Sequence, residues 1–203
     1  MSAIDSRKFE EIEKAVHELN WYWKYFNEIF IGINPFDRLE LLQSASPIFF
    51  GLCRTAFYEQ LMLIIARLCD PATSRVKGVD SDNLSLKNLI QCLPKIPSAL
   101  QLKIDNFNQV VDSNYGSIKT LRDKKIAHTD SSVKLGLQQI SSPLESEVIK
   151  LIDAINSLCS AINMEYKGQS IVFTPYSTDN AKSEHLFNVL RVGIANVGFD
   201  NVR

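Results

Sequence analysis

Apolar side chains recur at intervals of three and four residues along most of this chain, and that spacing is typical of helices that bury one face. Between residues 6 and 33 the pattern is continuous, and Ser6 can cap the helix that it predicts. The side chains on this face are Phe9, Ile12, Val16, Leu19, Trp23, Phe26 and Phe30. The periodicity therefore predicts an all-α fold.

Helix-ending residues divide the chain into a bundle of five or six helices with a short C-terminal extension. Pro47 is expected to kink or break the stretch 37–69, because proline lacks a backbone N–H and disfavours helical geometry in the residue before it. Residues 72–83 resemble a polar loop, and 169–174 a short strand or an extended arm. We expect a helical domain over 1–167 and an extension over 168–203. The predicted helices cover 6–33, 37–69, 86–93, 98–112, 115 to about 127, 143–166 and 179–195.

The stretch 37–69 is the most apolar part of the chain. Its apolar residues cover most of the helix circumference, as they do in a helix at the centre of a bundle or at a dimer seam. Arg54, Glu59 and Arg67 are the charged exceptions. We expect Arg54 and Arg67 to form structural ion pairs.

The composition fits a soluble globular protein whose contact with nucleic acid is local. The 203 residues carry a formal net charge of −1, and 45% of them are apolar and 22% charged. Neither a secretion signal nor a run of about 18 uncharged apolar residues is apparent. The four cysteines are scattered without metal-ligand spacing, which predicts reduced thiols in the cytoplasm. We expect no metal, no cofactor and no membrane partner.

Residues 121–130, LRDKKIAHTD, resemble the last turns of a helix that leads into a polar break. On a wheel of about 100° per residue, Tyr115, Ile118, Leu121 and Ile126 form the apolar face, and Arg122 falls inside it. Arginine is almost never fully buried without a partner. Arg122 should therefore point into a cleft or across a subunit interface, where an anionic group meets it.

His128 lies six residues after Arg122, which in a straight helix places the two side chains about 120° and about 9 Å apart. They cannot then act on one reacting atom. Either the helix ends near Ala127 and His128 turns back, or two chains each supply a set. The sequence favours an ending, because Thr129, Asp130 and the two serines that follow bond readily to their own backbone.

These residue types suit the cleavage of an RNA phosphodiester. His128 can exchange protons near neutral pH, and Arg122 offers permanently charged donors for phosphoryl oxygens. Residues 117–134 contain five basic and two acidic side chains, a local charge of +3. We expect Lys119, Lys124 and Lys125 of this set to bind RNA. Ordinary surface helices also contain an arginine and a histidine at this spacing, so the spacing alone leaves both interpretations open.

Arg122-Asp123 followed by His128 resembles the motif of the HEPN superfamily, which is an arginine, usually a polar residue, and a histidine after a short gap. Residues 121–130, and LIIARLCDPA at 63–72, are similar to the branch found in AbiU-type phage abortive-infection proteins. The resemblance covers about 35–165 in element order.

The resemblance implies an all-helical domain that forms a homodimer and brings two motif copies into one cleft. Active members are metal-independent ribonucleases, which implies catalytic roles for Arg122 and His128 and an orienting role for Asp123. It also implies a 2′,3′-cyclic phosphate product, a role in phage defence or toxin-like growth arrest, and an antitoxin partner. Other members have lost activity and act as binding or structural modules, which is the alternative.

Overall fold

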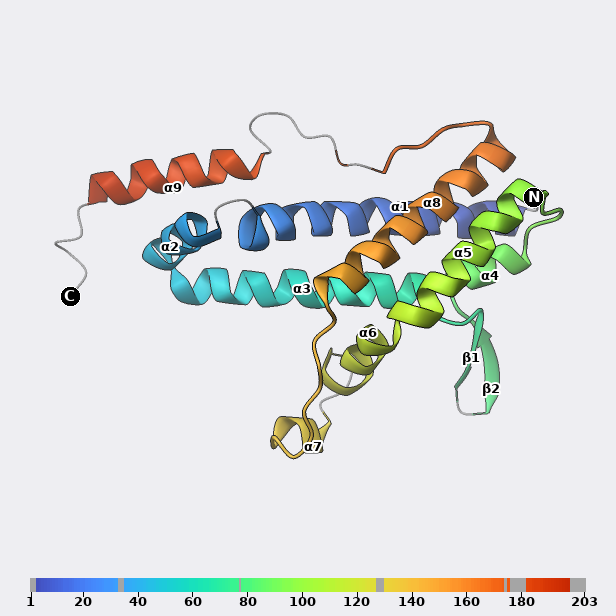
Figure 1. Ribbon diagram of the computed structural model, residues 1–203, viewed down its shortest axis with the longest axis horizontal. Coiled ribbons are helices and arrows are strands. Elements are labelled where there is room, and N and C mark those ends of the chain that lie inside the picture. The colour runs from blue at the N-terminus through green and yellow to red at the C-terminus, as the bar shows by residue number, and fades with distance from the viewer. Residues whose placement is uncertain are drawn as a thin grey trace. The chain divides into compact units, whose positions relative to one another are not determined.

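The computed structural model describes residues 3–32, 35–76, 78–126, 130–173, 175 and 182–197. These residues form α-helices, two π-helical turns and one β-hairpin, so the predicted all-α class is confirmed (Figure 1). The helices are α1 (Ala3–Phe26), α2 (Pro35–Ala45), α3 (Pro47–Cys69), α4 (Leu86–Gln91), α5 (Ser98–Asn114), α6 (Gly116–Leu121), α7 (Ser131–Lys134), α8 (Glu145–Lys167) and α9 (Ser183–Val197). The π-helical turns are η1 (Asn27–Ile31) and η2 (Arg122–Ile126), and the strands are β1 (Thr73–Val76) and β2 (Val79–Asp82).

The predicted break before Pro47 is confirmed. α2 ends at Ala45 and α3 begins at Pro47, with Ser46 between them. Proline is tolerated in the first turn of a helix, where its missing N–H would have no partner within the helix. The described helices outnumber the five or six that we predicted, because this break, the π-helical turns and the short α4 and α7 subdivide the sequence pattern.

Residues 73–82, predicted as a polar loop, form the hairpin instead. β1 and β2 are antiparallel with Thr73 opposite Asp82 and Val76 opposite Val79. Gly78 supplies the φ of +84° that the turn requires. Residues 73–82 show no strand pattern because every residue of β2 is exposed, so the strand carries no alternation of apolar and polar side chains. Residues 169–173, a predicted strand or arm, form neither helix nor strand.

The chain forms two compact units that interleave in sequence. Unit 1 comprises residues 1–20 and 62–173, and unit 2 comprises residues 21–61 and 174–203. α1 and α3 each contribute residues to both units. The division predicted at residue 168 stays a prediction.

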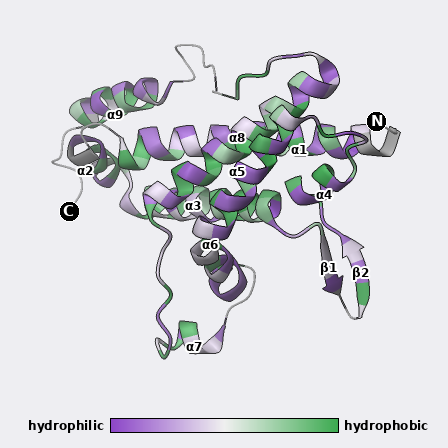
Figure 2. Ribbon diagram, turned by 45° about the vertical axis from the view of Figure 1, so that its right-hand side comes forward, coloured by the Kyte–Doolittle hydropathy of each residue, from purple (hydrophilic) through white to green (hydrophobic). Residues whose placement is uncertain are grey.

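Unit 1 has a core built from one face of each of its long helices. α5 and α8 lie side by side in it (Figures 1 and 2). Each fully buried aliphatic or aromatic side chain contributes roughly 1.5–3 kcal/mol through the removal of apolar surface from water. The core side chains of these helices include Phe9, Ile12, Val16, Leu19, Ile65, Leu68, Leu100, Ile104, Phe107, Val111, Leu151, Ile155, Leu158 and Ile162.

Polar pairs fix α1 against α8 within unit 1. The side-chain amides of Asn20 and Asn156 exchange hydrogen bonds of 2.8 and 2.9 Å. Lys167 forms an ion pair of 2.8 Å with Glu13. Gly168 then ends α8 with a φ of +65°, a left-handed conformation that favours glycine.

Unit 2 contains an aromatic cluster and one central arginine. Phe26 is buried, and its ring lies 5.7 Å from Phe30 and 5.9 Å from Tyr58. Arg38 of α2 pairs with Glu184 of α9 at 3.1 Å, and its guanidinium lies 4.8 Å from the ring centre of Phe187. Arg38 therefore links α2 to α9.

α3 is long and apolar enough, by length and composition, to cross a membrane. In its most apolar stretch of 18 residues, 22% is buried within the protein. A core helix of a soluble protein meets the same criterion. The Arg67 side chain near its end lies 3.8 Å from Glu18, which is the structural pairing predicted for Arg67. Arg54 has no such partner among the described residues, and it borders a small pocket with Phe30 and Phe50.

Candidate functional site

The motif segment begins with a buried face on α6. Tyr115 joins α5 to α6 with helical backbone angles, and its side chain is buried along with Ile118 and Leu121. The helix predicted to start near Tyr115 is thereby confirmed. The buried face fixes the rotation of α6, and so decides where the polar residues after Leu121 can point.

Glu147 attaches α6 to the start of α8. Its carboxylate accepts hydrogen bonds from the hydroxyl of Ser117 at 3.0 Å and from the backbone N–H of Leu144 at 2.9 Å. A negative group is favoured at a helix N-terminus because the unpaired N–H groups there carry partial positive charge. One carboxylate therefore caps α8 and anchors the motif segment.

The backbone changes from an α-helix to a π-helical turn at Arg122. The π turn η2 runs from Arg122 to Ile126. A π-helix bonds residue i to i+5, so the angles of a straight α-helix do not hold beyond Leu121. Single π turns are rare in proteins, and many of those that occur lie at functional sites. The regular α-helix therefore ends at Leu121, earlier than the end that we predicted near Ala127.

The Arg122 guanidinium lies between two carboxylates of its own chain. Its Nη1 atom is 2.7 Å from Oδ1 and 2.6 Å from Oδ2 of Asp70, and its Nε atom is 2.8 Å from Oδ1 of Asp123. Its side chain is 20% exposed and that of Asp70 is 22% exposed. The expected anionic partner of Arg122 is therefore present within the same chain, at the end of α3.

A buried tyrosine holds Asp70. The hydroxyl of Tyr115 donates to Oδ1 of Asp70 at 2.8 Å. Burial, and then this hydrogen bond, raise the pKa of Tyr115 well above its usual value, so the hydroxyl stays a donor. Partial burial alone would lower the pKa of Arg122, but hydrogen bonds to Asp70 and Asp123 outweigh it and raise the pKa. Arg122 therefore stays charged near neutral pH.

Asp70 is the residue that sequence reasoning missed. We interpreted it only as the end of a helix, because it lies 52 residues from Arg122 and no local pattern joins them. The available signal was the resemblance itself, since residues 63–72 and 121–130 were the two similar strings. The structure brings these strings together through one ion pair.

The three lysines predicted to bind RNA differ in their exposure and in their partners. Lys119 and Lys125 are exposed and have no hydrogen-bond or ion-pair partner among the described residues. Lys124 is half-buried and donates to Oε1 of Gln138 at 2.7 Å. Two of the three lysines are thus available to a polyanion, and the third also ties η2 to the segment after α7.

His128 lies outside the described residues, together with Ala127 and Thr129. The backbone N–H of Asp130 donates to the carbonyl of Lys124 at 3.2 Å, so a hydrogen bond joins the two described flanks of this gap. Asp130 then caps α7, accepting from the Ser132 hydroxyl and from the N–H groups of Ser132 and Val133. These bonds lower its pKa. The predicted capping role is confirmed for Asp130.

The remaining candidate ligands do not assemble into a metal centre in the described part of the chain, where no cluster of three or more His, Cys, Asp or Glu side chains could hold an ion. His17 packs its ring 4.8 Å from that of Phe173. All four cysteines are free thiols, and Cys69 and Cys159 are buried.

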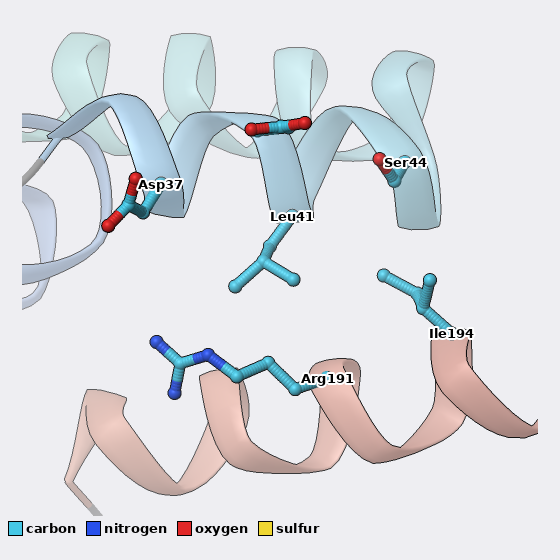
Figure 3. Close-up of a pocket in the computed structure, with 6 residues that line it drawn as sticks. Asp37, Leu41, Ser44, Arg191 and Ile194 are labelled. Atoms are coloured by element: carbon cyan, nitrogen blue, oxygen red, sulfur yellow. The ribbon is translucent and has the colours of Figure 1, made fainter.

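A separate pocket of about 380 Å³ lies in unit 2 between α2 and α9 (Figure 3). Asp37, Leu41 and Ser44 of α2 face Arg191 and Ile194 of α9 across it. Arg191 is also bonded to Asn188 at 3.0 Å on its own helix. None of the predicted site residues lines this pocket.

Fold and site together define an all-helical protein with a half-buried arginine-aspartate pair at the end of a motif helix. The model of the family HEPN_AbiU2, described as AbiU2, matches residues 6–187. The chain therefore belongs to the AbiU2 branch of the HEPN superfamily, as its motif predicts. The match continues past residue 167 into α9. No curated protein and no solved structure matches the chain.

Proposed function

We propose that this protein is a metal-independent endoribonuclease of the HEPN type. The observation that carries the proposal is the placement of Arg122: its charge is partly buried, held by two carboxylates, and flanked by exposed lysines on a segment of charge +3. A fixed guanidinium in a partly dry site stabilises phosphoryl charge far better than a mobile surface arginine does.

In the proposed reaction His128 removes the proton from a 2′-hydroxyl, and the leaving 5′-oxygen takes a proton from the second copy's protonated His128 or from water. The 2′-oxygen attacks the adjacent phosphorus, the bond from phosphorus to the 5′-oxygen breaks, and a 2′,3′-cyclic phosphate and a 5′-hydroxyl result. Arg122 binds the nonbridging oxygens as their charge grows, and Asp123 orients it. Lys119, Lys124 and Lys125 attract the strand.

We propose further that two copies supply the complete site, as the family motif implies. The start of α3 supports such an association, because Ile48, Phe49 and Leu52 are 78%, 58% and 67% exposed on one helix. Phage defence or growth arrest in the cytoplasm, with an antitoxin partner, is the role that this activity would serve. Light scattering of the wild type and of Phe49→Asp tests the homodimer, and a monomeric wild type contradicts it.

The second candidate is a catalytically silent helical module. The same cluster favours it, since Asp70 and Asp123 already satisfy two of the three nitrogens of Arg122. In that case the motif braces α3 against α6 and cleaves nothing.

RNA cleavage in EDTA separates the two candidates. Mixed RNA is incubated with the wild type, Arg122→Ala and His128→Ala, and with the controls Arg191→Ala and His17→Ala. The controls remove an arginine that pairs with Glu184 in unit 2 and a histidine that packs on Phe173. We expect cleavage by the wild type and the controls, and a loss of about 100-fold or more in both motif variants. Equal RNA survival with all five proteins refutes the nuclease and leaves the silent module.

A further inference from the structure

The Arg122 guanidinium has donors to spare. It carries five N–H groups on three nitrogens. Nε is bonded to Asp123 and Nη1 to both oxygens of Asp70, whereas Nη2 has no hydrogen-bond partner among the described residues. Two edges of the guanidinium are therefore fixed, and one terminal nitrogen remains open to a further acceptor.

Asp70 is itself held in place on several sides. Its backbone N–H donates to the carbonyl of Ala66 at 2.8 Å, which keeps it in the last turn of α3. Its Oδ1 accepts from the buried hydroxyl of Tyr115 at 2.8 Å, and Pro71 follows it directly. Two segments that are far apart in the sequence, residues 66–71 and Tyr115, therefore set the position of one carboxylate.

A carboxylate beside such an arginine can act in two ways. It can compete with phosphate for the guanidinium, or it can fix the guanidinium in the orientation that phosphate needs. A competitor must leave readily, but Asp70 is anchored by Tyr115 and by its own helix. A fixed donor needs no reorganisation when charge develops on the substrate, and this is the usual source of electrostatic catalysis.

We propose that Asp70, held by Tyr115, is a positioning residue that keeps Nη2 of Arg122 directed at the scissile phosphate. This inference rests on the proposed ribonuclease function. Asp123 holds Nε, so the two carboxylates together restrict rotation of the planar guanidinium about the bond between Cδ and Nε. The exposed Lys119 and Lys125 offset the negative charge that the carboxylates add near the strand.

Asp70→Asn is the informative substitution. An asparagine offers one accepting oxygen where the aspartate offers two, and it has no charge with which to hold the guanidinium. Glu13→Gln is the matched control, because Glu13 pairs with Lys167 in the same unit at 2.8 Å with side chains of similar exposure. Asp70→Glu keeps the charge on a longer side chain, and Tyr115→Phe removes only the anchoring hydroxyl.

Steady-state cleavage of a defined RNA measures kcat and KM for each variant. We expect Asp70→Asn to lower kcat by about tenfold to 100-fold with a change in KM below about threefold, since a small misplacement of a catalytic group costs that much. Asp70→Glu should recover part of the loss, and Tyr115→Phe should lower kcat by a few-fold. Glu13→Gln should leave both constants unchanged. An Asp70→Asn variant that is as active as the wild type, or more active, overturns the proposal.

Binding of an uncleavable 2′-O-methyl RNA separates this inference from the proposed function. We expect Arg122→Ala to raise the Kd by about tenfold and Asp70→Asn to raise it by a smaller factor. Suppose that the wild type cleaves nothing but Asp70→Asn still weakens RNA binding. The proposed nuclease function is then refuted, whereas Asp70 still positions Arg122 for phosphate binding. If Asp70→Asn tightens binding, Asp70 is a competitor, and the inference fails whether or not the wild type cleaves RNA.

Discussion

The seam between α5 and α8 and the segment from α6 to η2 lie in the same unit, yet different forces organise them. The seam consists of regular helices whose apolar side chains are buried, such as Phe107, Ile155 and Leu158. The motif segment ends in a π turn, and its central side chain is Arg122, which forms ion pairs with the carboxylates of Asp70 and Asp123. The apolar side chains of the seam are buried, whereas Lys119 and Lys125 of the motif segment are exposed, so we assign stability to the first and the proposed chemistry to the second.

The largest loss of stability should come from the seam. Leu158 is fully buried, and replacing it with alanine removes apolar contacts and leaves a cavity. We expect Leu158→Ala to lower the free energy of unfolding by about 2–5 kcal/mol in urea denaturation. Leu137→Ala, at a position that is 79% exposed, should change it by less than about 0.5 kcal/mol. Equal losses at the two positions would mean that α8 is not a core helix.

Arg122→Ala should destabilise the protein less than a cavity in the seam does. It leaves Asp70 without its cation, but the two side chains are 20% and 22% exposed, so water can solvate the carboxylate in part. We expect a loss of about 1–2 kcal/mol, measured by the same denaturation. Asp70→Asn combined with Arg122→Ala should cost less than the sum of the single changes. Additive losses would show that the ion pair is not formed in solution.

Gly168→Ala should affect the end of α8. The φ of +65° at this position is unfavourable for a residue with a Cβ atom. We expect a loss of about 1 kcal/mol in thermal unfolding. Gly193→Ala provides the contrast, because Gly193 lies inside α9 with ordinary backbone angles and open space around it. That change should be neutral or stabilising.

The salt dependence of RNA binding should distinguish the exposed lysines of the motif segment from a lysine elsewhere. Lys119→Ala and Lys125→Ala should each reduce the slope of log K against log salt by about 0.7, if each contacts one phosphate of a single strand. Lys167→Ala is the control, since Lys167 of α8 pairs with Glu13 of α1. If the slope is unchanged for both motif variants, the RNA strand does not contact Lys119 or Lys125.

The smallest effect should be the pH dependence of the α7 cap. The pKa of Asp130 is lowered from 3.8 in the folded protein by bonds from Ser132 and Val133. Because the folded pKa is depressed, the cap stabilises the protein above the unfolded pKa, and this contribution is lost as pH falls through the folded value. Asp130→Asn should therefore lower the melting temperature slightly at pH 7, and the difference from the wild type should disappear in acid. A difference that persists in acid indicates another role for this side chain.

The fold could be predicted where burial follows a period. The helix break at Pro47 and the start of the motif helix near Tyr115 follow from local rules. The start of α4 also obeys a local rule, because Ser85 accepts from the N–H of Asn88, as a capping serine should. The hairpin at 73–82 was missed because an exposed strand carries no apolar signal.

The site could be predicted in its residues but not in its geometry. The wheel placed Arg122 on the buried face, and the side chain is indeed half-buried, with an anion beside it. The wheel could not supply the identity of that anion, because Asp70 belongs to a different helix. It also could not anticipate the π turn that begins at Arg122, because the wheel assumes a regular α-helix throughout.

The sequence by itself determined that this chain is helical, where its helices break, and that it belongs to the AbiU2 branch of the HEPN superfamily. These properties depend on neighbouring residues and on short strings, which are fixed before the chain folds. Only the tertiary structure decided that Asp70 and Tyr115 meet Arg122, since that contact exists only when α3, α5 and α6 pack together. An ion pair between residues far apart in the sequence depends on the packing of the whole unit, and no local pattern encodes it.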